Sequence, residues 1–176
     1  MNEAPDQRNC GTTMNRWVRS LLLVTEVGGG FTGLTFTVME CLQQTDAALE
    51  TYVFRAMFAG VSIYGIIAGI ALVERARLGM WLSLVCLGAQ IPVLSSPAFT
   101  YSLLFGVRLG VGWRADQGIL ALCQIGARMT IGLMHRAPLI VGVNLFALVL
   151  FMYLLLRVAT HPVHRKRSAV PSLTGQ

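Results

Sequence analysis

Long apolar runs are the feature that most limits what this chain can fold into. Three of them, at residues 17–38, 52–73 and 138–158, contain no more than two charged residues each. An α-helix needs about 20 mostly apolar residues to cross the roughly 30 Å of hydrocarbon in a bilayer. A fourth run, at residues 78–94, is shorter and approaches its end at Pro92. The four runs predict four transmembrane helices.

The charged residues indicate the same class of protein and its orientation. They make up 12% of the chain, which is about half the share found in soluble domains. Arginines lie before the first run, between the second and third runs and after the fourth, whereas the link between the first two runs carries only acidic charges. Positive charge marks the cytoplasmic ends of membrane helices. The pattern predicts an integral protein of a bacterial cytoplasmic (inner) membrane with both termini in the cytoplasm.

The chain divides into a membrane domain and two tails. Residues 1–16 are predicted to be a cytoplasmic tail, residues 17–158 the membrane domain, and residues 159–176 a basic cytoplasmic tail. A basic segment beside a membrane attracts anionic lipid, so the bilayer and anionic lipid at this tail are the first expected partners. Nucleic acid is not expected, because the basic residues form no exposed stripe.

Residues 97–134 alternate between apolar and small or polar side chains. From Phe99 to Trp113 every odd position is apolar, and the alternation resumes after a turn at Gly118. A period of two is typical of a β-strand with one buried face. The segment predicts a β-hairpin or small meander outside the membrane, because an open sheet edge cannot face lipid. The expected fold class is therefore a membrane bundle of four transmembrane α-helices, with a small extracytoplasmic β insertion between the third and fourth helices.

Two further membrane helices are the alternative for the same segment. Arg108 and Arg128 would then lie inside the two additional spans, at a high cost in free energy. Gly106, Gly110 and Gly112 would also weaken a helix. The β interpretation is preferred, although a ribbon of two strands is only marginally stable without a partner.

Four polar residues are expected to lie within the membrane. Glu26 falls roughly 13 Å into the first run at 1.5 Å per residue. Tyr64 and Gln90 fall at similar depths in the second and third runs, and Asn144 lies further out in the fourth. An ionisable group at such a depth marks a candidate functional site, here a proton or cation relay or a site for a ligand headgroup. The competing interpretation, which a single carboxylate favours, is a structural hydrogen-bond cluster.

Two pairs of glycines predict close helix packing. Gly29 with Gly33, and Gly65 with Gly69, have the spacing at which two membrane helices can bring their backbones together. The contact could form within one chain or between two copies, so a homo-oligomer is left open.

Several residues fall on the predicted outer side. Cys41 and Cys123 could form a disulfide there if the compartment is oxidising. His135 and Arg136 are expected to anchor the last span at the interface, and they are candidates to bind an anionic headgroup together with Arg128.

The sequence contains no nucleophile elbow, P-loop or zinc-protease pattern, so no catalytic, cofactor-binding or metal-binding residue is predicted. Three functions remain. The first is a non-enzymatic accessory or scaffold protein with a protein partner. The second is a small transporter or channel subunit that uses the cluster around Glu26. The third is a membrane enzyme acting on a lipid, which is least favoured because it needs several acids, histidines or metal ligands at one depth.

Overall fold

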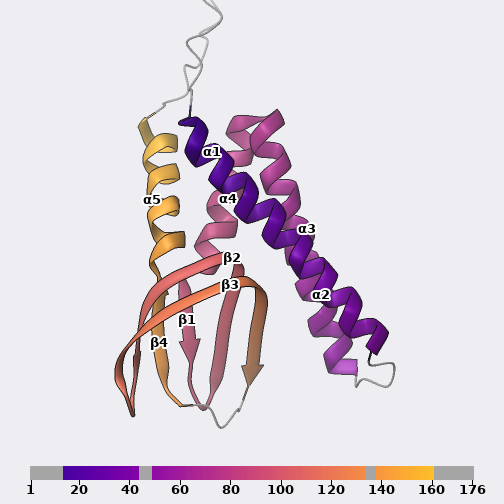
Figure 1. Ribbon diagram of the computed structural model, residues 1–176, viewed down its shortest axis with the longest axis vertical. Coiled ribbons are helices and arrows are strands. Elements are labelled where there is room, and N and C mark those ends of the chain that lie inside the picture. The colour runs from indigo at the N-terminus through magenta and orange to yellow at the C-terminus, as the bar shows by residue number, and fades with distance from the viewer. Residues whose placement is uncertain (1–13, 44–48, 134–137, 161–176) are drawn as a thin grey trace, which may run out of the picture.

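The computed structural model describes residues 14–43, 49–133 and 138–160, which form a layer of helices above a curled β-sheet (Figure 1). The first helix is continuous but contains one π-helical turn, so it is described in three parts. The helical elements in chain order are α1 (Arg16–Leu23), η2 (Val24–Gly28), α2 (Gly29–Gln43), α3 (Leu49–Glu74), α4 (Ala76–Gln90) and α5 (Leu145–Thr160).

Two helices in the described part of the chain are long and apolar enough to cross a membrane. They are Arg16–Gln43 with 28 residues and α3 with 26 residues. The core helix of a soluble protein is mostly buried, whereas only 39% and 28% of the most apolar stretches of these two helices are buried. Large apolar side chains are consequently exposed along both of them, among them Phe31, Phe36, Phe54, Ile63 and Ile67.

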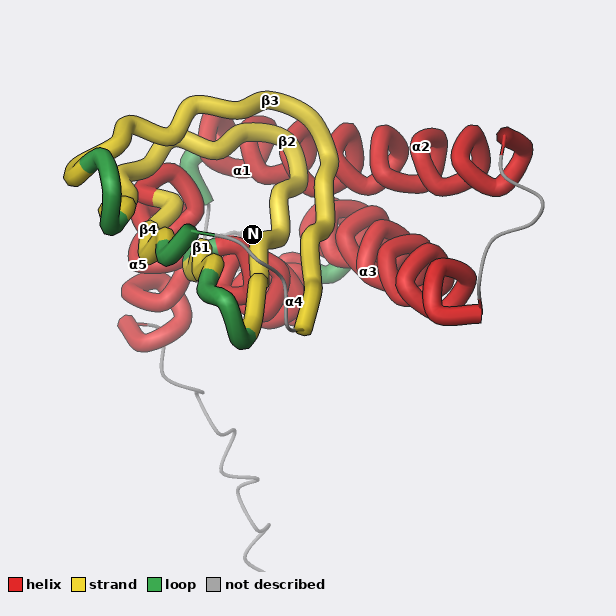
Figure 2. Tube along the Cα trace, turned by 90° about the horizontal axis from the view of Figure 1, so that it is seen from below, coloured by secondary structure: helices red, strands yellow, loops and turns green. Residues whose placement is uncertain are grey.

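The strands form one antiparallel sheet with the order β1-β4-β2-β3. β2 and β3 make a long hairpin in which the 16 residues of each strand are paired. β1 pairs with β4 and with the first half of β2, while β4 pairs with the second half of β2, so these three strands close into a ring under the arch of the hairpin (Figure 2). The strands are β1 (Pro92–Ser95), β2 (Phe99–Arg114), β3 (Gly118–Leu133) and β4 (Ile140–Asn144).

The hairpin bends where two glycines face each other. Gly106 of β2 pairs with Gly126 of β3, and their φ angles are 81° and 133°. Residues with a side chain rarely adopt such angles, and glycine does so without strain. A Cβ at Gly106 would also lie 2.6 Å from Cγ2 of Thr25 in η2. The crest of the bent hairpin therefore rests directly on the π-helical turn.

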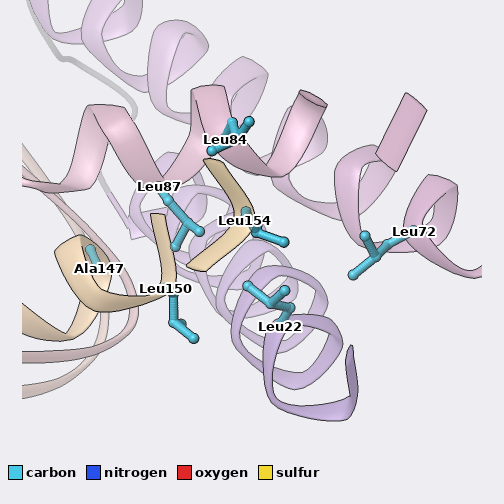
Figure 3. Packing of buried hydrophobic residues seen from close by; sticks show 7 residues of the cluster. All are labelled: Leu22, Leu72, Leu84, Leu87, Ala147, Leu150 and Leu154. Atoms are coloured by element: carbon cyan, nitrogen blue, oxygen red, sulfur yellow. The ribbon is translucent and has the colours of Figure 1, made fainter. Parts of the chain in front are cut away.

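Two apolar clusters hold the layers together. The larger one lies between α1, α3, α4 and α5, and Figure 3 shows its buried members: Leu22, Leu72, Leu84, Leu87, Ala147, Leu150 and Leu154. The smaller cluster joins α4 to β2 through Cys86, Leu103 and Phe105. The Phe105 ring also stacks on Phe58 of α3, with 5.9 Å between the ring centroids.

The predicted bundle of four transmembrane helices is wrong. Only two described helices are candidate spans, because α4 and α5 have 15 and 16 residues. Residues 92–94 and 140–144, predicted to end the third span and begin the fourth, are strand residues. Pro92 cannot continue α4 because it lacks a backbone N–H, and Ile140–Asn144 places β-branched residues in the pattern that suits a pleated sheet. The predicted small hairpin or meander is thus part of a four-stranded sheet.

Candidate functional site

Glu26 lies in the π-helical turn at the centre of the molecule and is completely buried. The Ser83 hydroxyl of α4 donates a hydrogen bond of 2.9 Å to its Oε2. Its other oxygen, Oε1, is buried and has no hydrogen-bond partner among the described residues. A buried carboxyl oxygen without a partner costs free energy, so its retention calls for a physical reason. This π-helical turn places Glu26 between α3 and α4. π-Helical turns occur frequently at functional sites.

The other polar residues predicted for this cluster are each engaged elsewhere. The Tyr64 hydroxyl donates to the Leu82 carbonyl oxygen at 3.1 Å and joins α3 to α4. Gln90 ends α4, and its Oε1 accepts the Phe105 backbone N–H at 3.1 Å. These two bonds position α4 against its neighbours and do not reach the Glu26 carboxyl group.

Asn144 lies at the junction between β4 and α5. Its Oδ1 accepts the Ala147 backbone N–H at 3.4 Å, and its own backbone N–H donates to the Ile91 carbonyl oxygen at 2.9 Å. Asn144 therefore caps the first turn of α5 and fastens it to the end of α4. Among the described residues, Glu26 therefore forms no hydrogen bond with Tyr64, Gln90 or Asn144, the three residues predicted to lie with it.

The predicted glycine pairs lie where the first helix meets its neighbours. A Cβ at Gly69 would lie 2.5 Å from Val27 Cγ2, and one at Gly65 would lie 3.4 Å from the Glu26 carbonyl oxygen. A Cβ at Gly33 would clash with the Ser62 hydroxyl of α3. Gly29 instead faces the sheet, since a Cβ there would lie 2.8 Å from the Gly106 backbone nitrogen. All four glycines thus serve contacts within one chain.

A second polar region lies between the end of α2, the start of α3 and the strand β3. It is a cavity of about 700 Å³ whose charged lining residues are Glu40, Arg55 and Arg128. Arg55 is only 6% exposed although it lies near the start of α3, and its Nε is 3.8 Å from Oε2 of Glu40, which is 64% exposed. The sequence gives no signal that Arg55 and Arg128 line one cavity, because the two residues lie on elements that meet only in the folded chain.

A third buried charge lies inside the curled sheet. Arg108 donates hydrogen bonds to the Gln124 side chain at 3.1 Å, the Ser102 hydroxyl at 2.8 Å and the Leu103 carbonyl oxygen at 2.9 Å. Burial lowers the pKa of the Arg108 guanidinium, and the positive charge of Arg128 lowers it further. Arg108 therefore holds the concave face of the sheet together and lies close enough to Arg128 for the two charges to repel.

The remaining predicted residues have simpler surroundings. Cys41 and Cys123 are both exposed free thiols. His135, Arg136 and the basic tail 159–176, apart from its first two residues, lie outside the described part of the chain. Ser83 was not identified from the sequence, because a serine in an apolar helix carries no signal that it will meet a carboxylate 57 residues away.

Comparison with protein-family models, curated proteins and solved structures finds no match to this chain.

Proposed function

We propose that this chain is a multi-pass membrane protein whose helical end is cytoplasmic and whose curled sheet lies toward the opposite face. The observation that carries the proposal is the apolar outer surface shared by the long helices and the sheet. Soluble monomers rarely expose contiguous apolar patches larger than a few hundred Å². Here exposed apolar residues lie along α2 and α3, and others lie on one face of the three paired strands β2, β3 and β4.

The outward face of the sheet is also apolar. On β2 its residues Leu109, Val111 and Trp113 are between 47% and 48% exposed, and on β3 Ile119 and Ile125 are 80% and 83% exposed. The register places Trp113 beside both Ile119 and a valine of β4, so the three strands present one surface. The closed ring of β1, β4 and β2 removes two open sheet edges, whereas β3 pairs with β2 alone among the described strands.

The charges support the orientation. The start of α1, the junction of α3 with α4, and the end of α5 lie together at the upper end in Figure 1. Arginines occur at all three places, and Arg19 donates a 2.7 Å hydrogen bond to the Val73 carbonyl oxygen at the end of α3. Trp17 of α1 and Trp81 of α4 are also exposed. Arginine at cytoplasmic ends and tryptophan at the interface are the usual anchors of membrane helices.

Labelling with a membrane-impermeant maleimide tests the orientation in intact cells. Both variants carry Cys10→Ser and Cys123→Ser, because Cys123 is an exposed free thiol of the sheet, and in this background Cys41 at the outer end of α2 is expected to react without permeabilisation. A matched Cys41→Ser, Arg77→Cys variant, with its thiol at the start of α4, is expected to react only after permeabilisation. Release of the protein from membranes by alkaline carbonate, or labelling of Arg77→Cys from outside, would overturn the proposal.

Within this location the favoured role is that of a non-enzymatic accessory protein that presents the outward sheet face to a protein partner. A photocrosslinking residue at Ile119, which is 80% exposed, is expected to capture a discrete protein in native membranes. The same residue placed at Arg77, on the opposite end, is the control and is expected not to capture that protein. Crosslinks from Ile119 to lipid alone would refute the accessory role and leave the membrane location intact.

A transporter or channel subunit is the second candidate, because Glu26 is fully buried and its Oε1 lacks a partner among the described residues. A carboxyl group in this setting can hold and release a proton. Proton or cation flux into proteoliposomes that disappears in Glu26→Gln would support this role. Flux that is equal in the wild-type protein, Glu26→Gln and empty liposomes would exclude it.

A further inference from the structure

One edge of β3 has no strand beside it. β3 pairs with β2 alone among the described strands and forms the outer side of the arch in Figure 2, whereas β1 and β4 each pair with two neighbours. In an antiparallel ladder, alternate peptide groups of such a strand point away from its neighbour. β3 therefore presents a row of N–H and C=O groups without a strand partner, to which another strand can add.

The first half of this edge lacks the features that usually keep edge strands apart. Proteins protect such edges with charged side chains, proline or very short strands. Residues 118–126 contain no charged residue and no proline. The second half of β3 begins at Ala127, contains Arg128 and lines the cavity beside α2 and α3. The unprotected edge is therefore residues 118–126.

Glycines mark both ends of the unprotected edge. Gly118 follows the turn of the hairpin with a φ of 77°, and Gly126 lies at the bend with a φ of 133°. Leu122 is midway between them. Antiparallel pairing with a second copy about a two-fold axis at Leu122 uses the whole edge and places Gly118 of each copy opposite Gly126 of the other. This pairing forms about eight to ten hydrogen bonds between the two strands.

The same register brings together the most exposed apolar side chains of β3. Ile119 and Ile125 are 80% and 83% exposed, and the register places each opposite the other in the second copy. Pairs of β-branched side chains across two strands stabilise a sheet. Leu122 on the axis points into the ring instead, since a Cβ at Gly142 would lie 3.1 Å from its Cδ1. The strand can therefore pair without turning its inner face outward.

The charges around the edge are compatible with a second copy. No like charges meet within residues 118–126, because this stretch is uncharged. Two residues beyond each of its ends, the register puts Asp116 of one copy at the position of Arg128 of the other. The two Arg128 residues are offset by roughly 40 Å along the strands, at about 3.4 Å per residue. Charges of opposite sign therefore approach each other, and charges of the same sign stay apart.

We propose that two copies of this chain pair through residues 118–126 of β3, antiparallel and in the register that places Ile119 opposite Ile125. The two sheets become one continuous sheet, and the peptide groups of both edges gain partners. In lipid no other polar partner is at hand, and this part of the argument rests on the membrane location proposed above. The register and the charge pattern do not depend on that location.

Disulfide trapping in native membranes tests the register. In a Cys10→Ser, Cys41→Ser background, Ala121→Cys places its thiol opposite Cys123 of the second copy. Opposite Cα atoms in an antiparallel pair are about 4.5–5.5 Å apart, which a disulfide can bridge. Mild oxidation is expected to convert most of this variant into a species of twice the chain mass on a non-reducing gel.

Ile125→Cys in the same background is the matched control. Residue 125 is as far from Cys123 along its own strand as residue 121 is, and it is also exposed. In the proposed register it lies opposite Ile119 of the second copy, four residues from that copy's Cys123, so it is expected to give little crosslinked product. Crosslinking of Ala121→Cys that does not exceed crosslinking of Ile125→Cys would overturn the pairing.

Two charged double variants test the pairing without a crosslink, by size-exclusion chromatography with light scattering in a neutral detergent. The wild-type protein is expected to contain two chains. Ile119→Glu with Ile125→Glu sets like charges opposite each other at both ends, whereas Ile119→Glu with Ile125→Lys sets opposite charges there. The first is expected to dimerise at least tenfold more weakly than the second. A single-chain wild-type protein, or equal masses of the two double variants at all concentrations, would overturn the proposal.

Extraction of the same samples with alkaline carbonate separates this proposal from the membrane location. A chain that is released by carbonate but still dimerises with this dependence on charge would refute the membrane location and support the pairing. A chain that stays in the membrane as single copies would refute the pairing and leave the membrane location intact.

Discussion

Replacing Gly29 by alanine tests the close approach between the first helix and the sheet. A Cβ at Gly29 would lie 2.8 Å from the Gly106 nitrogen and 2.9 Å from the Phe105 carbonyl carbon. Ordinary contacts between such atoms are roughly 3.5–4.0 Å. Both neighbours are backbone atoms of β2, so they cannot turn aside as a flexible side chain could. The helix and the sheet must separate instead.

The adjacent residue Gly28 is the matched control. It is exposed, and a Cβ there would meet nothing within 4 Å. Both substitutions gain about 1 kcal/mol of helix propensity, so this gain cancels when the two variants are compared. The difference between them isolates the packing cost, which for an overfilled contact is about 1–3 kcal/mol.

Unfolding of the detergent-solubilised protein by a denaturing detergent, followed by circular dichroism, measures that difference. We expect Gly28→Ala to be at least as stable as the wild-type protein, and Gly29→Ala to unfold more readily than Gly28→Ala by about 1–3 kcal/mol. Equal free energies of unfolding for the two variants would show that β2 does not rest on the helix at this point.

Three further predictions concern the sheet and its junctions. Gly106→Ala is expected to lower the free energy of unfolding by about 2–5 kcal/mol, because strain at its φ of 81° adds to the contact with Thr25. Gly118 has a similar φ of 77°, but a Cβ there meets only open space, so Gly118→Ala is expected to cost about 1–2 kcal/mol in the same unfolding assay. Asn144→Ala is expected to lower the free energy of unfolding by about 0.5–2 kcal/mol, because the buried Ala147 N–H loses its acceptor. Asn15→Ala, at the exposed start of α1, is expected to cost less, because water can replace the Asn15 side chain as the acceptor. Equal costs for the two variants would refute the role of burial. Burial raises the pKa of Tyr101 above its usual 10.0, and its hydroxyl donates to the Ala89 carbonyl oxygen at 2.7 Å. The folded protein therefore holds this proton more tightly than the unfolded chain, so stability falls as the pH rises above about 10, and Tyr101→Phe is expected to reduce that fall in alkaline unfolding curves.

The π-helical turn links the structural and functional interpretations. Thr25 and Glu26 are consecutive residues of this turn. Thr25 lies under the bend of the hairpin, and Glu26 accepts the hydrogen bond from Ser83. The residue that contacts the sheet thus directly precedes the buried carboxyl group in the chain. The comparison of Gly28→Ala with Gly29→Ala measures the strength of that contact independently of Glu26.

The sequence by itself determined the features that depend on local pattern. Apolar runs of sufficient length indicated the two long helices, because a span is a property of one segment. The alternation of apolar with mostly small or polar residues in 99–133 indicated strands, because side chains on a strand point to opposite faces in turn. The arginines at helix ends indicated one basic end, which the structure assembles from α1, α3, α4 and α5.

Only the tertiary structure decided where ambiguous apolar segments belong and which polar groups meet. Ile140–Asn144 is compatible with either a helix or a strand by composition, and the unpaired edges of β1 and β2 made it a strand. The bond between Ser83 and Glu26, and the cavity that brings Arg55 near Arg128, depend on elements that are far apart in sequence. Periodicity and charge describe neighbours along the chain, whereas these contacts are chosen by the packing of helices on a curled sheet.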